Sequence, residues 1–215
     1  MKILAIETSN EVCGAALFDD DRIISEKNVL FPKYSSSEIF NLINKVYKKG
    51  RIDCVAVDIG PGSFTGIRIG VSLARAYGQF LKIPVIGISG LDCFVYKYNS
   101  EHLKNRKICY PIIDALREEV YTAEYSGLER KGEYKIIKIE ELKEKLNKNC
   151  VVIGNSAICS KFNLGKICIK TQLSASLVGR TARMEIGKGL IKSYKDIYPL
   201  YIRKSFAEEK IEHRK

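Results

Sequence analysis

Residues 58–70, DIGPGSFTGIRIG, constrain the fold of this chain more than any other segment. They follow the apolar run at 55–57 and precede a long stretch with helical periodicity. This order is typical of a buried strand, a sharp glycine-rich turn and a helix. Pro61 fixes one φ angle of the turn, and the glycines on either side allow conformations that a side chain forbids. Backbone N–H groups at such a helix start can bind an anion.

The helix after this turn has two distinct faces. Four small residues recur at every fourth position and share one face: Gly66, Gly70, Ala74 and Gly78. Glycine inside a helix costs about 1 kcal/mol relative to alanine, so this stripe predicts close packing against a neighbouring helix of this chain or of a partner. Larger apolar side chains on a second face are expected to pack on the sheet: Ile69, Leu73, Ala76 and Phe80.

Composition places the chain among ordinary globular proteins. Its 215 residues, 46% hydrophobic and 28% charged, suffice for one large domain or two small lobes. No apolar run approaches the ~20 residues that span a bilayer, and the first residues lack the pattern of a signal peptide. A cytoplasmic location without membrane association is therefore expected. The net charge of +11 suits contact with RNA or another polyanion, although a lysine-rich genome produces the same excess.

Cysteine and histidine usage argues against a metal site built by this chain. The seven cysteines form no CxxC pair, and the two histidines, His102 and His213, are isolated. Buried reduced thiols are the expectation, with a redox or metal role as the alternative.

The two halves of the chain open alike. Strands are predicted at residues 2–6 and 12–18, and again at 107–114 and 119–125. In each half the first strand ends in a carboxylate, Glu7 or Asp114. The pattern predicts an α/β fold of two related lobes, at 1–100 and at 101–215 with a charged tail, each with a mixed sheet and helices. Such paired hairpins are typical of actin-like ATPases and sugar kinases.

Four blocks resemble the TsaB (YeaZ) family: ILAIETS at 3–9, GPGSFTGIRIG at 60–70, DALREEVYTAEY at 114–125 and PLYIRKSFAEE at 199–209. The resemblance implies a duplicated actin-like ATPase fold. It also implies a role in the synthesis of N6-threonylcarbamoyladenosine at position 37 of tRNA. In that family the chain is a non-catalytic paralogue that binds and supports the catalytic subunit TsaD, so no catalytic residue is assigned here.

The same resemblance implies partners. TsaD is the main partner, the ATPase TsaE joins the complex, a homodimer uses the same helices, and tRNA is a further candidate within the complex. No intrinsic cofactor is expected, and ATP or ADP is a candidate at the complex interface. The residues assigned to the partner interface lie on two helices and the turn between strand and helix: Ile39, Ile43, Phe64, Gly66, Arg68, Gly70, Ala74 and Gly78.

Glu7, Thr8 and Ser9 are candidates for residual nucleotide contact, because they follow the first strand where nucleotide-binding relatives hold phosphate. A purely turn-forming role is the alternative for all three. Asp114 is the matching acid of the second half.

Around the glycine-rich turn, Ser63 and Thr65 are expected to cap the helix. Phe64 is expected to anchor either the core or a partner. Arg68 opposes the helix dipole, so it should pair with a partner carboxylate, an internal acid or a phosphate.

The sequence leaves two rival functions open. A small actin-like metabolite kinase needs a general base and an adenosine pocket, for which the sequence offers little, and the glycine-rich block lacks the GK[ST] ending of a P-loop. A protease is the second rival, but the sequence contains no metal-binding motif and no catalytic triad.

Overall fold

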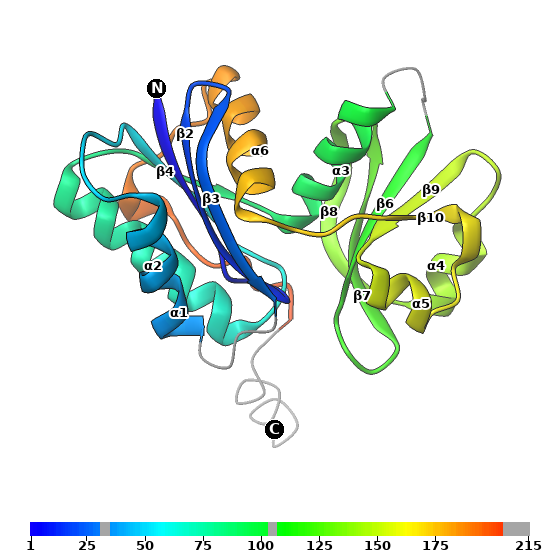
Figure 1. The fold of residues 1–215 in the computed structure, drawn as a ribbon. Helices are drawn as coiled ribbons and strands as arrows, with labels where there is room; N and C mark the ends of the chain where they lie inside the picture. Colours follow the sequence, from blue (N-terminus) through cyan, green and yellow to red (C-terminus); the bar gives the residue numbers. More distant parts are fainter. Residues whose placement is uncertain (31–34, 103–106, 204–215) are drawn as a thin grey trace, which may run out of the picture.

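The computed structural model describes residues 1–30, 35–102 and 107–203, which form two α/β lobes lying side by side (Figure 1). The predicted charged tail at 206–215 lies outside the described residues. Within the described ranges, no helix combines the length and apolarity needed to cross a membrane.

The first lobe is a five-stranded mixed sheet in the order β3-β2-β1-β4-β5. The first three strands pair antiparallel, β3 with β2 and β2 with β1, whereas β4 pairs parallel with β1 and β5. Two helices cover one face and bury their apolar stripes against β1, β2 and β4. The elements of this lobe are β1 Lys2–Glu7, β2 Val12–Asp19, β3 Arg22–Leu30, α1 Ser35–Val46, β4 Cys54–Asp58, α2 Phe64–Leu81 and β5 Val85–Ile88.

The second lobe repeats this topology, with the sheet order β8-β7-β6-β9-β10. Its first hairpins are antiparallel and its later strands are parallel, as in the first lobe. The predicted duplicated α/β fold of actin-like type is therefore confirmed. The elements are β6 Ile108–Asp114, β7 Glu119–Ser126, β8 Glu129–Lys138, α4 Ile139–Lys145, β9 Cys150–Gly154, α5 Ser156–Lys161, η1 Gly165–Ile167 and β10 Cys168–Lys170.

Two helices lie between the sheets, α3 (Gly90–Glu101) and α6 (Ala175–Gly187) (Figure 1). Helix α6 comes from the second half of the sequence but packs on β1 and β2, whereas α3 packs on β6. A single core thus joins Ala5 and Phe18 of the first sheet to Ile113 of the second. The domain boundary near residue 100 stays a prediction.

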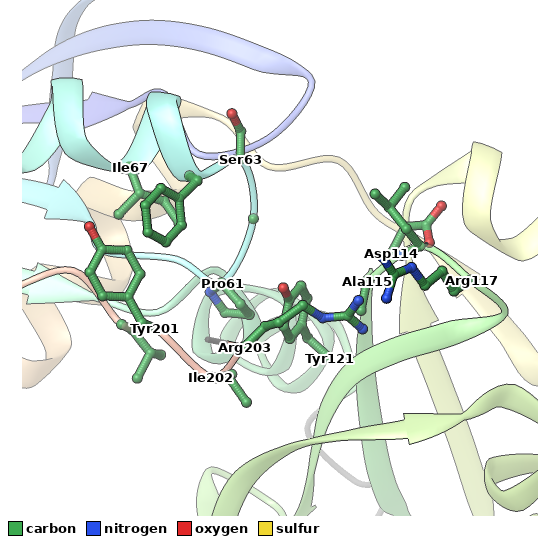
Figure 2. Close-up of a pocket in the computed structure, with 14 residues that line it drawn as sticks. Pro61, Ser63, Ile67, Asp114, Ala115, Arg117, Tyr121, Tyr201, Ile202 and Arg203 are labelled. Carbon is green, nitrogen blue, oxygen red and sulfur yellow. Dashed lines mark hydrogen bonds between the residues drawn. The ribbon is translucent and has the colours of Figure 1, made fainter. Parts of the chain in front are cut away.

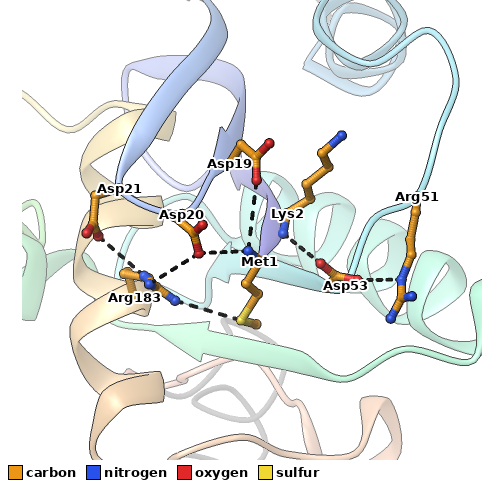
Figure 3. A network of polar contacts seen from close by, with 8 residues as sticks. All are labelled: Met1, Lys2, Asp19, Asp20, Asp21, Arg51, Asp53 and Arg183. Atoms are coloured by element: carbon orange, nitrogen blue, oxygen red, sulfur yellow. Dashed lines mark hydrogen bonds and ion pairs between the residues drawn. The ribbon is translucent and has the colours of Figure 1, made fainter.

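Polar contacts hold α6 against the first sheet at the chain start (Figure 3). Arg183 of α6 approaches Asp21 Oδ1 at 3.3 Å and Asp20 Oδ1 at 3.5 Å. The Met1 amino group donates to the same Asp20 oxygen at 2.7 Å. Both carboxylates are exposed, so these contacts orient α6 more than they add to stability.

The cysteines follow the expectation only in part. Five are buried thiols outside any disulfide: Cys13, Cys54, Cys93, Cys109 and Cys150. Cys159 and Cys168 form a disulfide between α5 and β10, so the expectation of reduced thiols is wrong for this pair. The turn between them brings two positions nine residues apart into contact, which spacing alone does not reveal.

Candidate functional site

A pocket of about 400 Å³ opens between the two lobes (Figure 2). Three segments far apart in sequence build it: the glycine-rich turn with the start of α2, the turn between β6 and β7, and the segment at 200–203. Its lining residues are Pro61, Gly62, Ser63, Phe64, Ile67, Asp114, Ala115, Leu116, Arg117, Tyr121, Leu200, Tyr201, Ile202 and Arg203.

The glycine-rich turn positions the start of α2 at this pocket. Ser63 caps the helix, since its Oγ accepts a hydrogen bond from the Gly66 N–H at 3.2 Å, as predicted. Thr65 lies inside the first turn and is exposed. Gly62 has a φ of 157°, and a Cβ there would overlap the Ser9 carbonyl oxygen. Only glycine therefore lets the turn lie this close to the end of β1.

An aromatic wall forms the first-lobe side of the pocket. The rings of Phe64 and Tyr201 stack with centroids 4.5 Å apart. The Arg68 guanidinium lies 4.1 Å from the Phe64 centroid, and its Nε donates to the Tyr201 hydroxyl at 2.8 Å. Within the part of the chain that the structure describes, Arg68 thus contacts two aromatic rings and forms no ion pair with an internal acid. Pairing with a carboxylate of a partner or with a phosphate stays a prediction. Phe64 is half-buried and packs within the chain.

Arginines gather on the opposite side. In Figure 2 the guanidinium groups of Arg117 and Arg203 point toward each other, away from Ile67 and Tyr201. Arg203 forms an ion pair with Glu119 at the start of β7. The segment at 200–203 therefore connects the first lobe, where the Leu200 N–H donates to Ile59 O at 2.8 Å, to the second.

The turn that carries Arg117 is conformationally unusual. Leu116, Arg117 and Glu118 have φ values of 64°, 51° and 60°, a left-handed region that costs non-glycine residues free energy. Asp114 stabilises this turn, because its Oδ1 accepts a hydrogen bond from the Leu116 N–H at 2.8 Å. Its Oδ2 pairs with Lys161 at 2.9 Å. The acid at the end of β6 thus shapes the turn and is neutralised by a cation.

The equivalent acid of the first lobe, Glu7, is fully buried. Ser9 Oγ lies 2.8 Å from Glu7 Oε1 and 2.5 Å from Asp58 Oδ2, and all three residues are buried. Burial raises the pKa of Glu7 well above its ordinary value, and the neighbouring Asp58 carboxylate raises it further. Burial likewise raises the pKa of Asp58 to about 6.

Thr8 is also engaged within the chain, since its Oγ1 donates to Gly66 O at 2.8 Å. The hydroxyl groups of Thr8 and Ser9 and the Glu7 carboxyl therefore stabilise the junction of β1 with α2. Nucleotide contact by these three residues stays a prediction, and their burial gives a ligand little access to their side chains.

The small-residue stripe of α2 faces the protein's own sheet. A Cβ at Gly66 or Gly70 would overlap Thr8, and one at Gly78 would lie 2.5 Å from Val85 Cγ2. The structure thus partly reverses the roles predicted for the two faces of α2. The small-residue stripe packs on the sheet, whereas part of the larger apolar face is exposed to solvent. Phe80 is 85% exposed and Ala76 is exposed, whereas Leu73 does pack in the core as expected.

The residues predicted for the partner interface consequently divide in two. Phe64 and Arg68 reach the surface. The others are buried in the first lobe: Ile39, Ile43, Gly66, Gly70, Ala74 and Gly78. The close approach that the stripe indicates is satisfied inside the chain, and partner binding by any of these residues stays a prediction.

Sequence reasoning missed Asp58 as the partner of Glu7, and it missed Arg117, Tyr121 and Arg203 as pocket residues. Each lies within one of the blocks that resemble the TsaB family or borders one. Three of these blocks meet at the pocket, and this convergence was the available signal.

Across the described ranges, no group of three or more His, Cys, Asp or Glu side chains is arranged to hold a metal ion. The site consists of a pocket with aromatic and cationic sides, and Glu7 and Asp58 form a separate, buried carboxyl pair.

Comparison with known proteins identifies relatives. The model of the TsaD family, tRNA N6-adenosine threonylcarbamoyltransferase, matches residues 37–186. The tRNA threonylcarbamoyladenosine biosynthesis protein TsaB of Buchnera aphidicola subsp. Schizaphis graminum is 31% identical over 71% of this chain and 78% of its own length. The Bacillus subtilis protein of the same name is 35% identical over 58% of this chain. That match spans only 55% of the Bacillus subtilis protein.

Two solved structures share the fold across almost the whole chain. One is an uncharacterized protein from Pseudomonas aeruginosa with similarity to peptidase YEAZ, with a TM-score of 0.78, 20% identity, and coverage of 94% of this chain and 99% of that one. The other is YeaZ from Pseudomonas aeruginosa, with a TM-score of 0.74, 19% identity, and coverage of 93% and 99%. At this identity the likeness establishes the shared fold.

Proposed function

Because this chain belongs to the TsaB (YeaZ) family of tRNA threonylcarbamoyladenosine biosynthesis proteins, we propose that it is a non-catalytic subunit that binds and supports TsaD during tRNA modification. The observation that carries the proposal is the 31% identity to a TsaB protein over 71% of this chain. The match of the TsaD model to residues 37–186 supports a shared lineage with the catalytic subunit.

The surface proposed for TsaD is the outward face of α2. It carries Phe80, which is 85% exposed, and the exposed Arg68 at the other end of the helix. An exposed phenylalanine next to polar residues is a common anchor in protein interfaces. The buried glycine stripe lies beneath this face and holds α2 on its sheet.

Further partners belong to the same proposal. TsaE would join the TsaD complex, ATP or ADP would bind at the interface, and the net charge of +11 would favour the approach of tRNA. A homodimer would compete for the face of α2 that TsaD uses.

The proposed function is tested by threonylcarbamoyl transfer to unmodified tRNA, using TsaD and TsaE of the same organism and preformed threonylcarbamoyl-AMP. Omission of this chain should reduce modification to background, and this chain alone should give none. Full modification without it would refute the proposal and favour the metabolite kinase.

The proposed surface is tested with Phe80→Asp. A carboxylate in place of the exposed ring should weaken TsaD binding by about tenfold or more, because a charge is costly in a desolvated contact. Binding is measured by titration calorimetry, and circular dichroism checks the fold.

Leu128→Asp is the matched control, since Leu128 is 45% exposed in the β7–β8 turn of the other lobe. Equal TsaD affinity of the Phe80→Asp variant and the unmodified chain would exclude the outward face of α2 as the contact.

A further inference from the structure

We propose that this chain binds tRNA directly, through a strip of lysines along one edge of the first sheet. The strip lies at the amino ends of the parallel strands β1, β4 and β5, whereas the glycine-rich turn follows the carboxyl end of β4. The choice of tRNA as the ligand rests on the proposed function, but the strip itself follows from the fold. The lysine strip consists of Lys2, Lys48, Lys49, Lys82 and Lys192.

The topology of the first lobe brings these residues to one edge. A helix that connects two parallel strands runs back along the sheet, so it ends near the amino ends of the strands. Lys48 and Lys49 therefore lie at this edge, between the end of α1 and the start of β4. Lys82 lies there for the same reason, between α2 and β5.

Backbone hydrogen bonds fix the other two lysines at the same edge. The Asp53 N–H donates to Lys2 O at 2.8 Å, and the Val85 N–H donates to Lys192 O at 3.2 Å. Neighbouring strands lie about 4.8 Å apart, so the three strand ends distribute the lysines along an edge of about 10 Å. The strip is therefore a row of cations drawn from five places in the sequence.

The acids near the lysine strip pair with other cations. Arg51 pairs with Asp53 at 2.6 Å, and the Met1 amino group pairs with Asp20 at 2.7 Å. In Figure 3 the side chain of Lys2 points away from Asp53. Within the described part of the chain, no ion pair engages a lysine of the strip, and all five residues are exposed. Their charges therefore face solvent.

Lys82 occupies a backbone position that suits a lysine poorly. It ends α2 with a φ of 54° and a ψ of 42°, a left-handed conformation in which glycine is the usual residue. Glycine does follow the other two helices of this lobe in such a conformation, at Gly50 after α1 and Gly189 after α6. A side chain here costs free energy, and such a cost is retained where the side chain has a function.

A row of exposed ammonium groups suits a polyanion with regularly repeated charges. Each phosphate that a lysine neutralises releases counterions from the nucleic acid, and this release dominates the affinity at low salt. Such contacts position the backbone without reading the base sequence. The proposed function brings this protein together with one such polyanion, tRNA, and we therefore take tRNA as the occupant.

The lysine strip is tested by fluorescence anisotropy with the full chain and labelled, unmodified tRNA at several salt concentrations. Binding should be saturable and should weaken as the salt concentration rises. Lys49→Ala combined with Lys192→Ala should weaken binding by about tenfold at low salt. The slope of log K against log salt should fall by about two, because two phosphate contacts are lost.

Lys135→Ala combined with Lys143→Ala is the matched control. This double variant removes the same charge from exposed positions on β8 and α4 of the other lobe. It should keep the tRNA affinity within about twofold and leave the salt slope unchanged. Circular dichroism checks the fold of both double variants.

Lys82→Gly separates RNA binding from a purely structural role of the residue at the helix end. It should weaken tRNA binding by roughly threefold and lower the salt slope by about one. The melting temperature should stay the same or rise, because glycine adopts the left-handed conformation freely. A lysine that only complements the helix dipole would leave the tRNA affinity unchanged.

Three results would overturn the proposal: no saturable tRNA binding, an equal loss of affinity in the two double variants, or an unchanged affinity in Lys82→Gly. A parallel titration uses phosphatidylglycerol vesicles. Strip variants that weaken vesicle binding but not tRNA binding would assign the strip to a membrane surface and would also overturn it. No assay here contains TsaD, so failure of the strip is distinct from failure of the transfer assay.

Discussion

The buried cluster of Glu7, Ser9 and Asp58 holds more acceptor atoms than its hydroxyl group can serve. Ser9 Oγ carries one proton yet lies within hydrogen-bond distance of a carboxyl oxygen on each side. Asn10 Nδ2 already donates to it at 2.7 Å. One carboxyl must therefore carry a proton and donate to Ser9, which agrees with the raised pKa of both acids.

This shared proton predicts that the protein loses stability as the pH rises. Both carboxyl groups have a higher pKa in the folded than in the unfolded chain, so the folded state binds more protons. The contribution is fully present below pH 4 and is lost as the pH passes about 6 and above. Glu7→Gln removes one acid and keeps the shape, so the loss of stability between pH 5 and pH 8 should become smaller. Urea unfolding at pH 5 and pH 8 measures it.

Glu129→Gln serves as the control for this measurement, because Glu129 is an exposed acid at the start of β8. A Glu7→Gln variant whose loss of stability between pH 5 and pH 8 equals that of the Glu129→Gln variant would contradict the shared proton.

At the scale of the element, α2 shows what a sequence pattern can and cannot determine. The capping Ser63, the helix and its small-residue stripe all follow from the sequence of residues 58–81. The partner of the stripe does not, because a glycine face predicts close approach without identifying what approaches. Here Thr8 and the end of β1 lie against it. Phe80, an apolar residue at a core-like spacing, is instead 85% exposed.

Gly66→Ala should therefore destabilise the chain itself, since the new methyl group would overlap the backbone carbonyl of Thr8. Overpacking of this kind costs roughly 1–3 kcal/mol. The melting temperature should fall by roughly 3–10 °C in calorimetry.

Gly187→Ala provides the comparison, because Gly187 ends α6 and a Cβ there meets nothing within 4 Å. It should leave the melting temperature unchanged or raise it slightly. A Gly66→Ala variant as stable as Gly187→Ala would show that the stripe is free to accept side chains, as a partner interface would require.

At the scale of the molecule, the repeat of strands was visible in sequence because strand patterns and terminal acids recur in each half. The packing of α6 on the first sheet was not visible, since an amphipathic pattern in the sequence does not identify the sheet that the helix covers. Short elements such as β10 also lack enough residues for a periodic signal. The pocket depends on residues 200–203, whose position follows from tertiary packing alone.

The core that spans both sheets predicts that the lobes unfold together. Cys54 on β4 and Cys109 on β6 are both buried in it. Their thiols should become reactive at the same urea concentration in pulse labelling read by mass spectrometry. Two separate midpoints would instead show that each lobe is an independent unit.

The return of α6 to the first sheet also has a consequence for synthesis on the ribosome. The strands of that sheet are complete at Ile88, but the helix that covers one of its faces begins at Ala175. At the usual elongation rate of roughly 5–20 residues per second, several seconds pass before α6 is synthesised and can cover that face. The nascent chain therefore exposes an apolar surface throughout translation of the second lobe, and chaperone demand should concentrate in this interval.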